Sequence, residues 1–446
     1  DVKFSYSLYG DPAVASARSN YVENMIHTNG KFDVNKAITV VNDTTIIFHF
    51  THKYPQRLFH LNLSPIPKHI YRNADRATLR SNPANEDPVG GGPYYVAKWI
   101  RQQEITLASN ERCKLPAPGV LENVVARVIT EPTTRLTELK KGTVDLMWPV
   151  YPEDVDELQR DYPDIRLETL PPRGYEYIGW ANIDFDQYRE SNGKKIVPHK
   201  LFGDKRVRQA LTYAIDRYSI MKAKLKEYGE IAVSDISPIF RWALNNELKP
   251  YPYNPDYAQE LLSKAGWSDT DGDGILDKNG VKFEFTLHYN AGNKRREYAC
   301  TVAQENLKQV GIKVKIEAVD PVVFFDKIGN KELDAFMAGF SVGLAIDPTD
   351  RWGDIHNPFN NTGFSHPRVD ELINLALHSD SNAEAAPFWK DLQFILHQEQ
   401  PCTFMYWIKD IVGVNRRLKN TNINVLGPLD RMWEWRIGDP QGYATY

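Results

Sequence analysis

The most regular pattern of apolar and polar positions in this chain lies between residues 202 and 216. Within Phe202-Gly-Asp-Lys-Arg-Val-Arg-Gln-Ala-Leu-Thr-Tyr-Ala-Ile-Asp216, apolar side chains recur at intervals of three and four residues: Val207, Ala210, Leu211, Ala214 and Ile215. This spacing predicts an amphipathic helix with one buried face. Asp204 is placed to accept hydrogen bonds from the unpaired amides of the first turn, so the helix is expected to begin beside it.

Other segments carry either the two-residue period of strands or the period of helices. Alternating apolar residues at 45–50 and 283–289 predict half-buried strands, and the patterns at 301–310 and 369–376 predict helices. Gly311 separates the first of these helices from a strand pattern at 312–316, where it suits a left-handed helix cap. The mixture predicts an α/β fold, and the helix–glycine–strand joint indicates a parallel sheet.

Composition excludes several classes of protein. A chain of 446 residues is too long for one core and predicts two or more lobes. Its net charge of −4, without a basic stripe, argues against a nucleic-acid partner. Three scattered cysteines, Cys113, Cys300 and Cys402, do not make a disulfide framework or a zinc site, although one bridge is open to them. The sequence has no run of 18 consecutive apolar residues, the length that would predict a transmembrane helix.

Aromatic residues make up 12% of the chain, including 10 Trp and 23 Tyr. Large cores account for such a content, and so does a ligand cleft lined with rings. The sequence leaves both explanations open.

Seven short blocks carry a resemblance that runs from end to end of the chain. Besides 202–216, they are Pro65-Ile-Pro-Lys-His-Ile70, Asp87-Pro-Val-Gly-Gly-Gly-Pro-Tyr94, the spaced set Arg135, Leu139, Gly142 and Asp145, Tyr253-Asn-Pro-Asp-Tyr-Ala258, Leu261-Leu-Ser-Lys-Ala-Gly-Trp267, and Gly363-Phe-Ser-His-Pro-Arg-Val-Asp370. In this order they resemble the family 5 extracytoplasmic solute-binding proteins, the receptors that feed oligopeptide, dipeptide and nickel ABC importers. Gly91 departs from the family block, where Thr is usual.

The resemblance implies a two-lobed α/β fold, periplasmic binding protein type II, with an extra subdomain on lobe I. Residues 1–86 are then the remnant of that subdomain, 87–184 most of lobe I, 185–405 lobe II, and 406–446 the return to lobe I. The ligand lies between the lobes and is buried by their closure. Such a receptor delivers its ligand to a permease, performs no chemistry, needs no cofactor, and is expected to be a periplasmic or extracytoplasmic monomer.

The first residues, Asp1-Val-Lys-Phe-Ser-Tyr6, resemble a helix that in the family follows a long stretch of strands. We therefore expect that an upstream segment, with any signal or lipid anchor, precedes these residues in the whole protein. Without such strands, lobe I would expose a sheet edge and part of its core.

The loop that faces the ligand in this family starts with glycine and an aromatic residue, here Gly339 to Pro348. The resemblance makes Phe340, Ser341 and Asp347 ligand contacts. Members that take free peptides often carry an aspartate in this loop that anchors the α-ammonium group, but the matching position here is Leu344, or Gly343 if counted from the start of the loop. Since neither binds a cation, we expect a longer peptide held along its backbone, or a ligand without a free amino terminus.

Five further side chains are expected at the ligand by the same resemblance. Trp180 and Asn182 lie in a stretch similar to the first hinge strand, Tyr406 and Trp407 match the returning strand, and Trp352 follows the loop. The alternative for each of the five is a packing role in a core or a hinge.

Asp269, Asp271, Asp273 and Gly274 form a D-x-D-x-D-G run, the opening of a calcium loop. Alternate carboxylates converge on one hard cation there, and the glycine permits the sharp turn. Ile275 would add its carbonyl and Asp277 a water-mediated contact. The twelfth position is Gly280, where such a loop has a bidentate glutamate, so the alternative is an ordinary acidic turn.

A serine hydrolase is the rival function, because Gly339-Phe340-Ser341-Val342-Gly343 also has the form of a nucleophile elbow. Asp370 and His397 would complete a triad in the order Ser, Asp, His. The residues after Ser341 are a poor start for the helix that an elbow needs, since Pro348 follows closely. A receptor of the same fold for a non-peptide ligand, such as an oligosaccharide, opine or metal chelate, is the other alternative.

Overall fold

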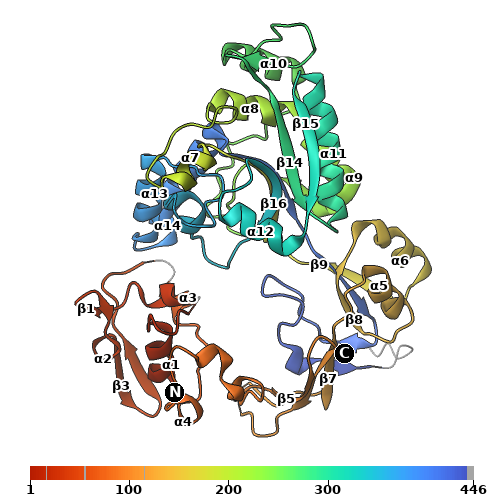
Figure 1. The fold of residues 1–446 in the computed structure, drawn as a ribbon. Coiled ribbons are helices and arrows are strands. Elements are labelled where there is room, and N and C mark those ends of the chain that lie inside the picture. Colours follow the sequence, from red (N-terminus) through yellow and green to blue (C-terminus); the bar gives the residue numbers. More distant parts are fainter. Residues whose placement is uncertain (17, 55–56, 115, 439–446) are drawn as a thin grey trace. The chain divides into compact units, whose positions relative to one another are not determined.

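The computed structural model describes residues 1–16, 18–54, 57–114 and 116–438. The chain divides into two compact units, unit 1 (Asp1–Leu170 with Ile411–Tyr446) and unit 2 (Pro171–Asp410). The lobe boundaries predicted from the sequence, 184/185 and 405/406, lie near these breaks and stay predictions. Figure 1 shows the course of the chain.

Unit 2 is built on a six-stranded mixed sheet with the order β11-β17-β10-β16-β14-β15. The strands are β10 (Gly174–Trp180), β11 (Gly229–Ile231), β14 (Glu284–Asn290), β15 (Lys313–Val319), β16 (Ala335–Ser341) and β17 (Cys402–Ile408). β14 runs parallel to both β15 and β16, which confirms the parallel pairing predicted from the helix–glycine–strand joint. β10 is antiparallel to β16 and β17, and Gly174 lies opposite both Ser341 and Ile408.

Helices cover both faces of this sheet (Figure 1). They are α7 (Phe185–Glu190), α8 (Lys205–Ala214), α9 (Arg217–Leu225), α10 (Pro255–Lys264), α11 (Lys294–Gln309), α12 (Pro321–Gly329), α13 (Pro367–Leu377) and α14 (Asn382–Glu399). The predicted cap of α8 is confirmed, since the amide of Arg206 donates to Asp204 at 2.9 Å. Gly311 has φ +79°, the left-handed conformation predicted between α11 and β15.

Two hydrophobic cores lie on the two faces of the unit 2 sheet. Because side chains alternate along a strand, Ile178 and Trp180 of β10 enter the core that contains residues of α8, α9 and α11. Tyr175 and Tyr177 enter the other core, with residues of α13 and α14. Between α10 and β14 lies a small hairpin of β12 (Asp277–Lys278) and β13 (Val281–Lys282).

Unit 1 consists of small antiparallel sheets. They are the pairs β1 (His27–Thr28) with β2 (Lys31–Phe32), β3 (Ile38–Asn42) with β4 (Thr45–Phe48) and β19 (Leu418–Lys419) with β20 (Arg436–Ile437), and the triplets β5 (Tyr94–Ile100)–β6 (Glu104–Ser109)–β7 (Asn123–Arg127) and β8 (Leu146–Val150)–β18 (Ile411–Asn415)–β9 (Ile165–Thr169). In the last triplet, the strand that follows unit 2 in sequence occupies the centre.

The helices of unit 1 are short. They are α1 (Val2–Tyr9), α2 (Val34–Ala37), α3 (Arg57–His60), α4 (Lys68–Tyr71), α5 (Pro132–Lys140) and α6 (Val155–Asp161). α1 packs through Tyr6 onto Phe48 of β4, with Met25 and Ile38 in the same core. Across the described parts of both units, no helix is long and apolar enough to cross a membrane.

Candidate ligand-binding site

The three parallel strands of unit 2 end at one edge of the sheet, at Asn290, Val319 and Ser341. We call this the carboxyl edge of unit 2. In open α/β sheets, ligands bind outside the carboxyl ends of the strands. The predicted ligand loop that starts at Gly339 leaves the sheet here, and β10 begins here opposite Ser341.

Gly339 is required by the close approach of its neighbours. A Cβ atom at this position would lie 2.7 Å from the carbonyl oxygen of Tyr175 and 3.0 Å from a guanidinium nitrogen of Arg296. The first of these contacts is with backbone, which has no freedom to move away without disturbing the β10–β16 pairing. The glycine that marks the loop in the sequence therefore has a packing reason in the structure.

Phe340 is half-buried and lies between several aromatic and cationic groups. Its ring stacks on Tyr177, with a centroid distance of 5.6 Å and an interplanar angle of 2°. The guanidinium of Arg351 lies 5.7 Å from the centre of the same ring, and Phe359 contacts it edge-on at 6.1 Å. Phe359 is itself 55% exposed. The structure thus places Phe340 in a fixed orientation at the carboxyl edge, beside an exposed aromatic ring that no pattern in the sequence indicated.

Ser341 and Asp347 are exposed, whereas Val342 and Ile346 between them are buried. Ser341 is the last residue of β16 and is exposed. Asp347 accepts hydrogen bonds from the amide and the hydroxyl of Thr349, at 3.1 and 2.6 Å. One of its oxygens therefore accepts both bonds from the first residue of the short π-helical turn Thr349–Gly353, whose N-cap is Pro348. Between the two, Leu344 and Gly343 offer no charge to the ligand.

A buried carboxylate between two guanidinium groups supports the carboxyl edge. Glu176 of β10 is 2% exposed and accepts from Arg295 at 2.9 and 3.0 Å and from Arg296 at 2.9 Å. Arg296 also donates to the side-chain oxygen of Asn290 at 2.7 Å. Burial alone would raise the pKa of Glu176, but the charges and hydrogen bonds of the two arginines outweigh it and lower the pKa to about 2.

The cluster of Glu176, Arg295 and Arg296 therefore carries one net positive charge at neutral pH. It joins β10 to the first turn of α11, where the exposed backbone amides add partial positive charge. The carboxyl edge consequently offers a ligand more positive than negative potential from this cluster. No local sequence pattern could reveal it, because the partners lie 119 and 120 residues apart.

A second ion pair holds the segment that follows the loop. Arg351 donates to Asp235 at 3.1 Å, and the side chain of Asp235 is fully buried. Arg351 also donates to Asp350 at 3.1 Å. Burial opposes the charge of Arg351, yet the neighbouring Asp235 raises its pKa above the ordinary value, so the guanidinium facing Phe340 stays charged.

The other five predicted ligand contacts are buried within unit 2. Trp180 is fully buried and donates its indole N–H to the hydroxyl of Thr403 at 3.1 Å. Asn182 donates to the carbonyls of Trp180 and Pro401, at 2.8 and 2.9 Å. Tyr406 lies in the same core as Trp180, and Trp352 and Trp407 lie in the core on the other face. The structure gives all five a packing role, and their contact with a ligand stays a prediction.

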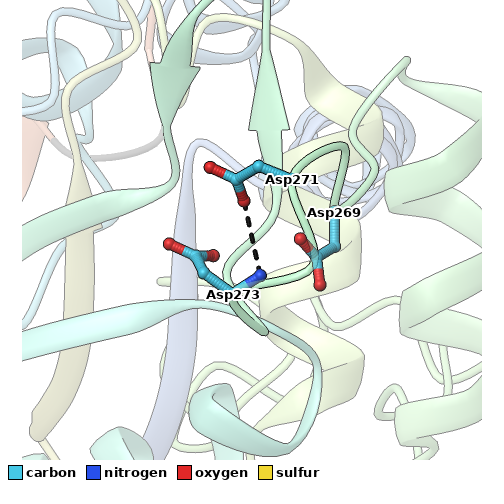
Figure 2. Close-up of side chains that lie close together, drawn as sticks. All are labelled: Asp269, Asp271 and Asp273. Atoms are coloured by element: carbon cyan, nitrogen blue, oxygen red, sulfur yellow. Dashed lines mark hydrogen bonds between the residues drawn. The ribbon is translucent and has the colours of Figure 1, made fainter.

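The acidic turn brings its three aspartates together, as Figure 2 shows. Ligand oxygens of Asp269, Asp271 and Asp273 lie within 4.8 Å of one another. The ammonium of Lys282 lies 2.6 Å from Asp271 and 3.0 Å from Asp273, however, and so already neutralises part of their charge. Asp277 is not in this group, because both of its oxygens accept from Thr270. Three of the predicted calcium ligands thus lie close together, and Lys282 would compete with a calcium ion for two of them.

The geometry does not support the serine hydrolase. β16 is followed by an irregular loop, and the π-helical turn starts only at Thr349, so Ser341 is not at the start of a helix. His397 in α14 points one ring nitrogen, Nε2, at the carbonyl of Lys249 at 2.8 Å, while Nδ1 lies 3.4 Å from Gln398. Among the described residues, no hydrogen bond joins His397 to Ser341 or to Asp370.

The sequence and the fold of this chain are similar to those of known proteins. The oligopeptide-binding protein AppA of Bacillus subtilis is 29% identical over 414 residues, which cover 91% of this chain and 73% of AppA. Heme-binding protein A of Haemophilus influenzae is 25% identical over 376 residues, covering 82% of this chain and 63% of that protein. The chain therefore spans between about three fifths and three quarters of the length of these relatives.

The structure of Bacillus subtilis AppA in complex with a nonapeptide is similar over 98% of this chain and 83% of its own, with a TM-score of 0.80 at 27% identity. This likeness confirms the predicted fold class, the α/β fold of a type II periplasmic binding protein. Residues 1–362 match the family described as bacterial extracellular solute-binding proteins, family 5. The chain belongs to the family 5 bacterial extracellular solute-binding proteins.

Proposed function

We propose that this protein is the substrate-binding receptor of an ABC importer and that it binds a peptide or peptide-like ligand at the carboxyl edge of unit 2. The observation that carries the proposal is the similarity to AppA over 91% of this chain, together with the AppA structure that holds a nonapeptide. Membership of an extracellular family places the protein in the periplasm or outside the cell membrane. It delivers the ligand to permease subunits as a monomer and catalyses no reaction.

The chemistry of the carboxyl edge restricts the ligand. Neither Leu344 nor Gly343 holds an α-ammonium group, so a short peptide gains no ion pair at the loop position where the family often carries an aspartate. The net charge of the cluster formed by Glu176, Arg295 and Arg296 favours a ligand with an anionic group. A peptide long enough to be held along its backbone, or one with a blocked amino terminus, fits both observations.

A non-peptide ligand is the second candidate. A relative at 25% identity is named heme-binding protein A, and this name supports a non-peptide ligand as the alternative. The half-buried Phe340 and exposed Phe359 offer rings on which a flat apolar group stacks.

Mass spectrometry of the purified protein under native conditions tests both candidates. Denaturation then releases the bound molecules, and we expect a mixed population of peptides with varied side chains. Release of one non-peptide compound from most of the protein would favour the second candidate and contradict the first.

Binding of the identified ligand should depend on Phe340. We expect Phe340→Ala to weaken binding at least tenfold in calorimetry, because a large stacked surface at the ligand is lost. Phe394→Ala is the matched control, since Phe394 is 52% exposed on α14 and lies outside the carboxyl edge. Equal losses in the two variants would contradict the assignment of the site.

The absence of catalysis is tested separately. We expect no turnover of short-chain esters by the purified protein and no difference between it and Ser341→Ala. Turnover that disappears in Ser341→Ala would overturn the receptor proposal in favour of the hydrolase.

A further inference from the structure

A pocket outside the candidate site lies in unit 2, among α8, α10, α14 and the loop 247–252. Its volume is about 530 Å³, which is typical of small-molecule sites. Residues 397 and 398 of its lining precede β17, whose first residue, Cys402, lies opposite Gly179 near the end of β10. The carboxyl edge lies at the start of β10, so the pocket is at the other end of the sheet.

Tyrosine rings form much of the lining, and we call this the tyrosine pocket. Tyr213 stacks on Tyr251 with a centroid distance of 4.6 Å, and Tyr257 lies edge-on to Tyr213 at 4.9 Å. Pro250 and Pro252 add further apolar surface. Rings and prolines of this kind suit the flat apolar body of a small organic molecule.

A buried positive charge adjoins the tyrosine pocket. A smaller hollow shares Tyr251 and His397 with the pocket, and Arg217 of α9 lines this hollow. Arg217 is 5% exposed, and its guanidinium donates to the carbonyl oxygens of Tyr251 at 2.7 Å, Phe404 at 2.6 Å and Ala232 at 3.3 Å. All three acceptors are neutral, so none of them compensates the charge.

Arg217 differs in this respect from the other buried arginines of the described chain. Arg208, Arg296 and Arg351 lie 3.7, 2.9 and 3.1 Å from a carboxylate. Within the described residues, no carboxylate forms an ion pair with Arg217. Burial lowers the pKa of Arg217 to about 10, so the guanidinium is still charged at neutral pH. A buried charge without a counter-charge is destabilising, and an anion bound nearby would relieve it.

The charge of Arg217 acts on the lining of the tyrosine pocket. Burial is the main cause of the lowered pKa of His397, and the charge of Arg217 lowers that pKa further. His397 is therefore neutral at pH 7 and donates from Nε2 to the carbonyl of Lys249 at 2.8 Å. The exposed side chains of Glu247 and Lys249 have opposite charges that offset each other. Arg217 thus gives the pocket a positive potential.

We propose that the tyrosine pocket is a second ligand-binding site of unit 2 and takes a small organic anion with a flat apolar body, such as an aromatic carboxylate. The tyrosine rings and prolines contact the apolar body, and the carboxylate faces the side of the pocket next to Arg217. Because Arg217 is shielded from water, its attraction for an anion is stronger than that of a surface arginine. This site does not depend on the function proposed above.

Three probes that share one ring system test the preference for an anion. They are 2-naphthoate, which is an anion, its neutral amide 2-naphthamide, and the cation 2-naphthamidine. In calorimetry with the wild-type protein, we expect 2-naphthoate to bind at least tenfold more tightly than the amide, and the amidine to bind most weakly. Equal affinities of the three probes, or no saturable binding of 2-naphthoate up to about 1 mM, would overturn the proposal.

Two tyrosine substitutions test the location. Tyr257 and Tyr253 are near each other in sequence and are 37% and 39% exposed, but of the two only Tyr257 lines the pocket. We expect Tyr257→Ala to weaken the binding of 2-naphthoate at least fivefold and Tyr253→Ala to leave it unchanged. Equal losses in the two variants would place the probe elsewhere and contradict the proposal.

Substitutions of Arg217 test the source of the preference. Arg217→Lys keeps the charge, whereas Arg217→Gln removes it. We expect the preference for 2-naphthoate over 2-naphthamide to persist in Arg217→Lys and to disappear in Arg217→Gln, while damage to packing alone would weaken both probes alike. A preference that persists in folded Arg217→Gln would overturn the proposal. If circular dichroism shows that Arg217→Gln does not fold, the probe series with the wild-type protein still decides, because it needs no substitution.

Discussion

Replacement of Glu176 by glutamine tests the charge cluster at the carboxyl edge most directly. Glutamine keeps the shape and removes the charge, so Arg295 and the largely buried Arg296 are left side by side without their common anion. The two guanidinium groups then repel each other, and Arg296 loses an ion pair in a position from which water is mostly excluded.

The pKa of Glu176 gives the size of the effect. It falls from an ordinary value of 4.5 to about 2 in the folded protein. At about 1.4 kcal/mol for each pH unit, the fold favours the ionised carboxylate by about 3 kcal/mol. Breaking a buried ion pair from one side is destabilising by about 3–5 kcal/mol. We therefore expect Glu176→Gln to lower the free energy of unfolding of unit 2 by about 3 kcal/mol at pH 7.

The effect should depend on pH in a defined direction. Because the folded-state pKa is lowered, the stabilisation by Glu176 is complete above its unfolded value of 4.5 and is lost as the pH falls towards about 2. Urea unfolding followed by tryptophan fluorescence at pH 7, 5 and 3 measures the difference between wild type and Glu176→Gln. This difference should be nearly constant from pH 7 to 5 and clearly smaller at pH 3.

Glu230→Gln is the matched control, since Glu230 lies on β11 of the same sheet but is exposed. We expect it to change the free energy of unfolding by less than about 0.5 kcal/mol at each pH. A loss below about 1 kcal/mol in Glu176→Gln at pH 7, or a loss that does not shrink at pH 3, would refute the reasoning.

Two further predictions concern the loop and the acidic turn. Gly339→Ala should destabilise unit 2 by about 1–3 kcal/mol in urea unfolding, because its Cβ would lie 2.7 Å from a backbone oxygen. Gly343→Ala is the control and should change stability little, since its Cβ would have no contact closer than 3.8 Å. Equal effects of the two substitutions would contradict the packing reason given for Gly339. Calcium must displace the ammonium of Lys282 from the aspartates, so Lys282→Met should bind calcium at least tenfold more tightly than wild type in calorimetry. Lys313→Met is the control, because it loses an exposed ion pair elsewhere, and it should bind calcium no more tightly than wild type. No binding heat in any of the three proteins would rule out calcium at this turn.

Local periodicity was sufficient to predict much of unit 2. The cap at Asp204, the left-handed Gly311 and the parallel strand after it depend on neighbours within a few residues, so the sequence contains the whole signal. The loop that starts at Gly339 was also located, since its glycine and aromatic residue are adjacent in sequence.

The environment of the candidate site could not be predicted in the same way. Glu176 meets its arginines from 119 and 120 residues away, and Phe359 meets Phe340 only because the loop after the π-helical turn folds back. Which face of a central strand a ring occupies depends on register, so the sequence did not reveal that Trp180 and Tyr406 lie in a core. Their contact with a ligand stays a prediction.

The central position of β18 has a consequence for how the protein is made. β8 and β9 leave the ribosome early, yet the strand that must lie between them begins only at Ile411, after the whole of unit 2. Unit 2 is continuous in sequence and can fold as soon as it has been synthesised, while unit 1 waits with two unpaired strands for its last part. Pairings between such distant segments form slowly and leave apolar edges open to aggregation meanwhile.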